Sequence, residues 1–147
     1  IVYNAQEAGI EKSIVGATTR EITEITQEVV AKGLFALGII EEEAQFRKYY
    51  PHGAAHHIGL DVHDLSNYGP LPVNSIITVE PGIYIPKGSP CDPKWWGIGI
   101  RIEDDILITE NGPINLSAGA PRKWEAIEAM MQQDSPLSKF ELPALSN

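Results

Sequence analysis

The four histidines are the residues of this chain most able to do chemistry, because they fall within twelve positions of a 147-residue sequence. They are His52, His56, His57 and His63, and glycines and other small residues separate them. Histidine is the commonest metal ligand and changes its charge near neutral pH. A surface loop with exposed histidines is the alternative interpretation, and two carboxylates later in the chain favour a metal site over it.

Those two carboxylates are Glu80 and Glu103, and each lies in an apolar, β-branched segment. Glu80 ends the run 75–80, just before Pro81 and Gly82. Glu103 and Arg101 are alternate residues of a strand-like run, so both point to one face. A buried carboxylate requires a cation or a proton. An ion pair of Glu103 with Arg101, or with a residue across the strand, is the structural alternative.

One histidine and two carboxylates on separate strands form a mixed nitrogen and oxygen ligand set, which suits manganese, zinc, cobalt or iron. In an ideal strand His56 and His63 would point to opposite faces, so a bend is needed if both serve one site.

The elements that must position these residues are predicted from hydrophobic periodicity. A first helix runs to about residue 14. Thr18 and Glu21 have the spacing of a capping box and open a second helix that stops at Gly38. Residues 41–48 form a short helix or an exposed connection. Strands are predicted at 55–63, 75–80, 83–85, 97–109 and 114–116, and a final helix runs from Pro121 to Met131. Two helices followed by a mostly antiparallel sheet predict the α+β class.

Composition excludes several classes of protein. The chain carries 11 basic and 20 acidic residues, a net charge of −9, which argues against a nucleic-acid-binding surface. No apolar run reaches the roughly 18 residues of a membrane span. Cys91 is the only cysteine, so no internal disulfide can form, and we expect a reducing, cytoplasmic location.

The chain is expected to hold one domain at residues 1–131 and a tail at 132–147, where prolines stand among serines and glutamines. The sequence begins without a methionine and inside a helical pattern that has no capping residue ahead of it. We therefore expect it to be a piece of a longer protein.

Three motifs in order resemble those of the pita-bread metallopeptidases, and within them the Xaa-Pro aminopeptidase and prolidase branch. They are His52-Gly53-x-x-His56-x-x-Gly59-Leu60-Asp61-Val62-His63-Asp64, Thr78-Val79-Glu80-Pro81-Gly82-Ile83-Tyr84 and Gly99-Ile100-Arg101-Ile102-Glu103-Asp104-Asp105. The resemblance runs from Ile1 to about Met131. It implies the C-terminal half of a pita-bread catalytic domain, in which helices pack on a curved, mostly antiparallel sheet.

The resemblance also implies a role for each residue at a site with two divalent metal ions. His56, Glu80 and Glu103 match metal ligands, and Glu80 also matches the carboxylate that takes a proton from the attacking water. His52 and His63 match histidines that contact the substrate around the scissile bond, where imidazoles can donate to a developing oxyanion. Arg101 matches an arginine near the site.

Two further ligands of the family, both aspartates, are not matched, because no aspartate precedes Asp61. They are expected upstream of this chain, which by itself is expected to be inactive. Manganese is the expected metal, with zinc or cobalt as alternatives.

The resemblance implies an aminopeptidase that releases an N-terminal residue preceding proline, so that the partner is a peptide with proline in second position. Prolidase, which cleaves dipeptides, is the alternative enzyme, and a peptide- or protein-binding relative of the same fold is the alternative outside enzymes. A metal-independent reaction that uses histidine is a third. A half-domain leaves apolar surface uncovered, so we expect a homodimer.

Overall fold

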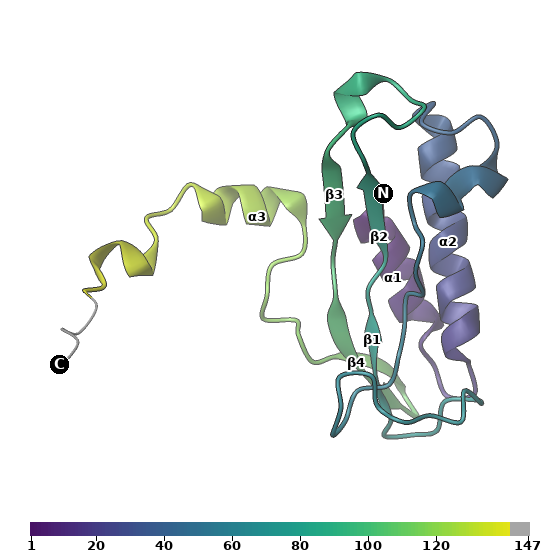
Figure 1. The fold of residues 1–147 in the computed structure, drawn as a ribbon. Helices are drawn as coiled ribbons and strands as arrows, with labels where there is room; N and C mark the ends of the chain where they lie inside the picture. The colour runs from purple at the N-terminus through teal and green to yellow at the C-terminus, as the bar shows by residue number, and fades with distance from the viewer. Residues whose placement is uncertain (142–147) are drawn as a thin grey trace, which may run out of the picture.

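The computed structural model describes residues 1–141. Two helices, α1 (Val2–Lys12) and α2 (Thr19–Ala36), pack against each other, and α1 also contacts the sheet (Figure 1). The capping box predicted at Thr18 is present, since its hydroxyl accepts from the Glu21 N–H at 3.2 Å and the Glu21 carboxylate accepts from the Thr18 N–H at 2.8 Å. Residues 41–48 resolve into a 3₁₀ helix, η1 (Glu43–Lys48).

The strands form two antiparallel sheets. One has the order β1 (Ile76–Val79), β4 (Asp104–Thr109), β5 (Gly112–Asn115), and the other pairs β2 (Gly82–Ile85) with β3 (Ile98–Arg101). The predicted continuous strand at 97–109 is therefore wrong, because it divides into β3 and β4. The pairing stops opposite Pro81, which has no N–H to donate to a sheet ladder.

The register of the two strand pairs is nevertheless the same on both sides of this interruption. Val79 pairs with Asp104 and Gly82 pairs with Arg101. The two strand pairs therefore form one twisted ribbon with a gap in its hydrogen bonding. In that register Glu80 stands opposite Glu103.

The histidine-bearing segment follows the other edge of β1 for a short distance. Glu80 N–H donates to Ala54 C=O at 2.7 Å, Thr78 N–H to His56 C=O at 2.9 Å, and Ile58 N–H to Ile76 C=O at 3.3 Å. The predicted strand at 55–63 is wrong: this segment makes an isolated bridge between His57 and Ile77, and beyond Ile58 the chain leaves the sheet, where the Leu60 side chain is fully exposed.

Two apolar clusters make the core. The first lies between the helices and β2, and the second lies under β1 and β4 and includes Ile22, Ile77, Ile106 and Ile108, each completely buried. Ile100 in β3 is 48% exposed, so the apolar, β-branched pattern of this strand does not correspond to burial within the described residues. Ile98, Ile100 and Ile102 instead line an apolar cavity of about 580 Å³.

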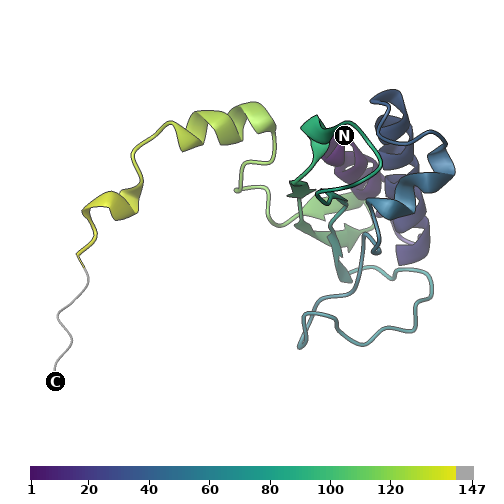
Figure 2. The ribbon, with the colours of Figure 1, turned by 45° about the horizontal axis from the view of Figure 1, so that its top comes forward.

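The C-terminal part extends away from this body. After β5, the helix α3 (Trp124–Met131) and the 3₁₀ helix η3 (Pro136–Lys139) form an arm that projects in both views (Figures 1 and 2). Elsewhere, a loop with the 3₁₀ helix η2 (Pro93–Trp95) joins β2 to β3. The final helix starts at Trp124 rather than at Pro121, because Arg122 is held against α1 and β4. Residues 142–147 of the predicted tail lie outside the described residues.

Within residues 1–141, no helix has both the length and the apolar composition needed to cross a lipid bilayer.

Candidate metal centre

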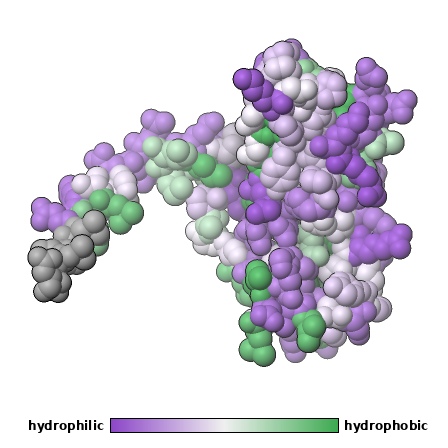
Figure 3. All heavy atoms as spheres, viewed as in Figure 1, coloured by the Kyte–Doolittle hydropathy of each residue, from purple (hydrophilic) through white to green (hydrophobic). Residues whose placement is uncertain are grey.

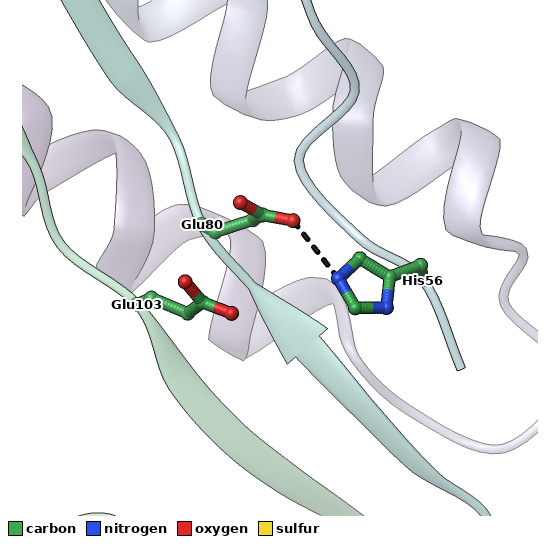
Figure 4. A group of neighbouring side chains, drawn as sticks. All are labelled: His56, Glu80 and Glu103. Atoms are coloured by element: carbon green, nitrogen blue, oxygen red, sulfur yellow. Dashed lines mark ion pairs between the residues drawn. The ribbon is translucent and has the colours of Figure 1, made fainter. Parts of the chain in front are cut away.

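Two carboxylates face each other where the ribbon is interrupted. Glu80 follows β1 and Glu103 follows β3, and their side chains project to the same side (Figure 4). Like charges placed opposite each other on neighbouring strands destabilise a sheet. The arrangement therefore favours a cation bound between them.

His56 completes a group of three possible ligands. Its Nε2 lies 3.1 Å from Glu80 Oε1, and both side chains are largely buried, with 20% and 14% of their surfaces exposed. One ligand atom from each of His56, Glu80 and Glu103 lies within 4.8 Å of the others. Ligand atoms about 2.1 Å from one ion, at angles near 90 to 110°, lie roughly 3.0 to 3.4 Å apart, so the separation of His56 and Glu80 fits a shared divalent ion.

The tautomer of His56 also suits a metal ligand. Its Nδ1 lies 3.0 Å from the carbonyl oxygen of His57, and this contact requires the proton on Nδ1. The Nε2 lone pair is then directed at the Glu80 carboxylate, so that two acceptors face each other. A shared proton or a metal ion between them resolves this contact. A backbone carbonyl that orients a ligating imidazole is typical of metal sites.

Threonines position the histidine segment. Thr78 Oγ1 accepts from the His56 N–H at 3.2 Å, and Thr23 Oγ1, on α2, accepts from the Ala54 N–H at 3.0 Å. The histidine segment is thus attached to β1 on one side and to α2 on the other. Local propensity alone would not hold this segment extended.

A cavity of about 400 Å³ opens beside the three ligands. Its lining includes five side chains that the sequence predicted for the site: His52, His56, His63, Glu80 and Arg101. The ring of His63 lies 4.4 Å from that of His56, centroid to centroid, at an angle of 59°. Arg101 Nη1 lies 3.8 Å from Glu80 Oε2. Arg101 therefore approaches Glu80, and the ion pair of Glu103 that was considered as an alternative is not found among the described residues.

The predicted bend between His56 and His63 is present. After Ile58 the chain turns back, and the Asp64 N–H donates to the His57 carbonyl at 3.0 Å, which brings His63 beside His56. His57 itself does not line the cavity. Six predicted site residues thus lie together, and their individual roles remain predictions.

Two tyrosines beside the cavity were not identified from the sequence. Tyr84 Oη lies 2.9 Å from His52 Nε2, and the ring of Tyr50 meets that of His52 edge to face at 5.1 Å between centroids. Burial raises the pKa of Tyr50 to about 12, so its hydroxyl keeps its proton. Tyr84 lies within one of the three motifs, four residues after Glu80, and that spacing was the available signal.

Comparison with known proteins also indicates a metallopeptidase. Residues 1–110 match the family model described as metallopeptidase family M24. The chain is 36% identical over 143 residues to a Xaa-Pro aminopeptidase of Haemophilus influenzae and 35% identical over 134 residues to the mitochondrial intermediate cleaving peptidase 55 of Arabidopsis thaliana. Each alignment covers 89% of this chain, but only 33% and 27% of those proteins.

Solved structures agree. Escherichia coli aminopeptidase P with the inhibitor Pro-Leu, and the zinc-substituted enzyme in complex with product, each superpose with a TM-score of 0.85 at 37% identity. These superpositions cover 89% of this chain, and 33% and 32% of theirs. The α+β architecture described above is therefore that of the pita-bread fold. The chain spans about a third of the length of the relatives it matches.

Proposed function

Because this chain belongs to metallopeptidase family M24, we propose that it supplies the C-terminal half of the catalytic domain of a Xaa-Pro aminopeptidase, with the domain at residues 1–131 and a tail at 132–147. The observation that carries the proposal is the facing pair Glu80 and Glu103 with His56 beside it. These residues fit a divalent metal, and relatives named Xaa-Pro aminopeptidase are 36 to 41% identical to this chain.

In this proposal, Glu80, His63 and Arg101 each have a different role in cleavage of the scissile bond. Glu80 would take a proton from the attacking water, and its contacts with Arg101 and His56 support this role. His63 lies next to His56 on the cavity wall, where it can contact the peptide around the scissile carbonyl. Arg101 also provides positive charge at the cavity rim. When bound, divalent ions supply a water of lowered pKa and stabilise developing negative charge.

We propose two metal ions, with manganese as the physiological metal and zinc or cobalt as alternatives. His56, Glu80 and Glu103 would contribute three ligands, and two aspartates from outside these 147 residues would contribute the rest. The chain alone should therefore bind Mn²⁺ weakly, and no more than one ion.

Calorimetric titration of Mn²⁺ tests this assignment. His56→Ala should weaken the binding at least tenfold, whereas His57→Ala, which changes a neighbouring histidine outside the cavity, should leave it unchanged. Tight binding of two ions by the chain alone would contradict the assignment of the remaining ligands to another segment.

The catalytic test uses the product of the complete reading frame that contains this sequence. We expect metal-dependent release of the first residue from a tripeptide with proline in second position, little release when alanine replaces that proline, and loss of activity in Glu103→Ala. The 147-residue chain alone should be inactive. Normal turnover by the chain alone, abolished in Glu103→Ala, would contradict the proposal.

The same assay separates the alternatives. Prolidase activity would appear as cleavage of Xaa-Pro dipeptides but not of tripeptides. A peptide-binding relative would bind without hydrolysis, and a histidine-dependent reaction would persist in EDTA. The presence of His56, Glu80 and Glu103 favours a metal-dependent enzyme over the peptide-binding relative and over the histidine-dependent reaction.

The partner we propose is a peptide with proline in second position, without nucleic acid or membrane, and the assembly we propose is a homodimer in the cytoplasm. The acidic composition and the single cysteine support the compartment. The Arabidopsis relative is described as mitochondrial, so fractionation of cells that express the complete protein is the measurement that decides.

A further inference from the structure

His52 lies on the cavity wall with both ring nitrogens in hydrogen-bond contact. Its Nδ1 lies 2.7 Å from the carbonyl oxygen of Gly53, and its Nε2 lies 2.9 Å from the hydroxyl of Tyr84. A carbonyl oxygen can only accept, so the proton of the neutral ring must be on Nδ1. Nε2 is then an acceptor, and the Tyr84 hydroxyl must donate to it.

Arg101 fixes which group donates and which accepts in this series of hydrogen bonds. Its Nη1 lies 3.5 Å from the Tyr84 hydroxyl, and a guanidinium can only donate. Arg101 therefore donates to the Tyr84 hydroxyl, Tyr84 donates to His52 Nε2, and His52 Nδ1 donates to the Gly53 carbonyl oxygen. Each group has a single role in this series, which leaves the neutral ring one favoured tautomer.

The sheet leaves space for the Tyr84 side chain to contact His52. Tyr84 pairs with Gly99 across the ribbon, and its side chain leans over Gly82. A Cβ atom at Gly82 would lie 2.5 Å from the Tyr84 hydroxyl oxygen and 2.8 Å from its ring carbon Cζ. Only glycine at position 82 leaves room for the hydroxyl where it now lies. A Cβ atom at Gly99 would be 3.8 Å from the ring, which is an ordinary contact.

A second aromatic ring packs against the His52 imidazole. Tyr50, buried beneath it, lies at 73° to the imidazole. Its hydroxyl is 2.9 Å from Thr26 Oγ1, and Thr26 Oγ1 donates to the Thr23 carbonyl at 2.8 Å, so Tyr50 must be the donor. Tyr50 thus packs against the ring, whereas the Tyr84 hydroxyl at Nε2 acts together with the Gly53 carbonyl at Nδ1 to favour the Nδ1–H tautomer.

We infer that Tyr84 is a positioning residue that holds His52 as the Nδ1–H tautomer, with Nε2 as a hydrogen-bond acceptor, and that Gly82 is required for this contact. Neutral His52 then cannot donate from Nε2 to a developing oxyanion. It can do so only as an imidazolium, because the Gly53 carbonyl keeps the Nδ1 proton in place. The consequence for peptide cleavage rests on the proposed function, whereas the tautomer does not.

Nitrogen-15 NMR of the histidine-labelled chain tests the inference directly. Spectra are recorded in EDTA at about pH 8.5, roughly two units above the ordinary pKa of histidine, and His52→Gln identifies the His52 signals. We expect His52 to carry its proton on Nδ1. In Tyr84→Phe, the Nε2 resonance should move to the position of a nitrogen without a hydrogen bond, and the population of the second tautomer should rise, because the Gly53 carbonyl alone then favours Nδ1–H.

Matched variants separate this contact from a general disturbance. Gly82→Ala should give the same spectral change although the hydroxyl is retained, because the new methyl group displaces it. Gly99→Ala, and Tyr68→Phe in an exposed loop, should leave His52 unchanged. A proton on Nε2 in the unmodified chain would overturn the inference without any variant, and so would unchanged His52 nitrogens in a folded Tyr84→Phe. Neither result depends on metal or activity, so failure here is distinct from failure of the proposed peptidase function.

Discussion

Glu80 and Glu103 show at the scale of single residues how a metal site opposes stability. Two carboxylates stand opposite each other on paired strands, and Arg101 approaches only Glu80, at 3.8 Å. Cross-strand pairs of like charge are unfavourable by a few tenths of a kcal/mol to about 1 kcal/mol. Without metal this part of the ribbon is under electrostatic strain, which a bound cation would relieve.

Glu103→Gln should therefore stabilise the metal-free chain while it weakens metal binding. We expect the free energy of unfolding in EDTA to rise by a few tenths of a kcal/mol, since Glu103 is exposed and its repulsion is screened. Urea denaturation measures the change, and Glu110→Gln, at an exposed turn, is the control and should have no effect. A loss of stability in Glu103→Gln would show that the carboxylate makes a favourable contact instead.

At the scale of elements, one buried polar network ties β4 and the start of the arm to α1. Asp104, 2% exposed, accepts from Arg122 Nε at 3.0 Å and from Asn115 Nδ2 at 2.8 Å. Arg122 Nη1 also donates to Gln6 Oε1 at 2.9 Å, and Gln6 Nε2 donates to the Val79 carbonyl at 3.1 Å. Val79 immediately precedes Glu80, so this network fixes the backbone that carries a ligand.

Removing Arg122 should be costly, because it leaves a buried carboxylate without its cation. Burial already raises the pKa of Asp104, and the hydrogen bond from Asn115 and the charge of Arg122 oppose that rise. We expect Arg122→Ala to lower the free energy of unfolding by about 3 kcal/mol, measured by urea denaturation at pH 7. Lys123→Ala should change it by less than about 0.5 kcal/mol.

A double variant identifies the cause of this loss. Asp104→Asn removes the charge, so Arg122→Ala should cost clearly less in that background. Equal costs in both backgrounds would mean that the arginine acts only through packing and through its bonds to α1.

The capping box of α2 gives a stability change with a definite pH range. The backbone and side-chain hydrogen bonds from Thr18, and then Lys12, lower the pKa of Glu21. A carboxyl whose pKa is lowered on folding adds stability above its ordinary pKa of about 4.3, and that stability is lost as the pH falls through the lower folded-state value.

Thr18→Ala should destabilise the chain by about 1 kcal/mol at pH 7. Glu21→Gln should be less stable than the unmodified chain at pH 7, and the difference should shrink below about pH 4.3. Urea denaturation at several pH values measures both effects. A pH-independent difference would show that the charge of Glu21 does not contribute.

At the scale of the whole molecule, apolar surface remains uncovered. The 580 Å³ cavity beside β3 is lined mainly by apolar side chains from α1, β2, β3 and α3. Figure 3 shows further hydrophobic surface on the projecting arm and at the end of the molecule where the long loops lie. The exposed apolar side chains of the arm are Trp124, Met130, Met131, Leu137 and Phe140. Contiguous patches of this kind mark interaction surfaces.

We therefore expect the 147-residue chain to form dimers or larger assemblies. Sedimentation velocity at several concentrations measures this, and Trp124→Glu, which places a charge between the cavity and the arm, should shift the equilibrium toward monomer. Glu125→Gln is the control on the same helix. A single monomeric species of 16.1 kDa at all concentrations would contradict the expectation.

The sequence by itself determined the α+β class, the first two helices and the capping box at Thr18, and it predicted the residues of the candidate metal centre. The helices and the cap follow from periodicity and capping residues. Side-chain types that bind divalent ions indicated a histidine with Glu80 and Glu103, and the family resemblance implied that the histidine is His56. The motifs that contain these residues also indicated the family. Strand boundaries were less well predicted, because Ile100 and Leu60 have the pattern of buried residues and yet lie on surfaces that the described chain does not cover.

Only the tertiary structure decided how those residues meet. The shared register that sets Glu80 opposite Glu103 depends on pairing between strands that are distant in the sequence. The bend that returns His63 to His56 depends on a turn without a sequence signature. The reach of Tyr84 to His52 depends on the empty space above Gly82. Such contacts are set by the packing of the whole chain, which no local preference encodes.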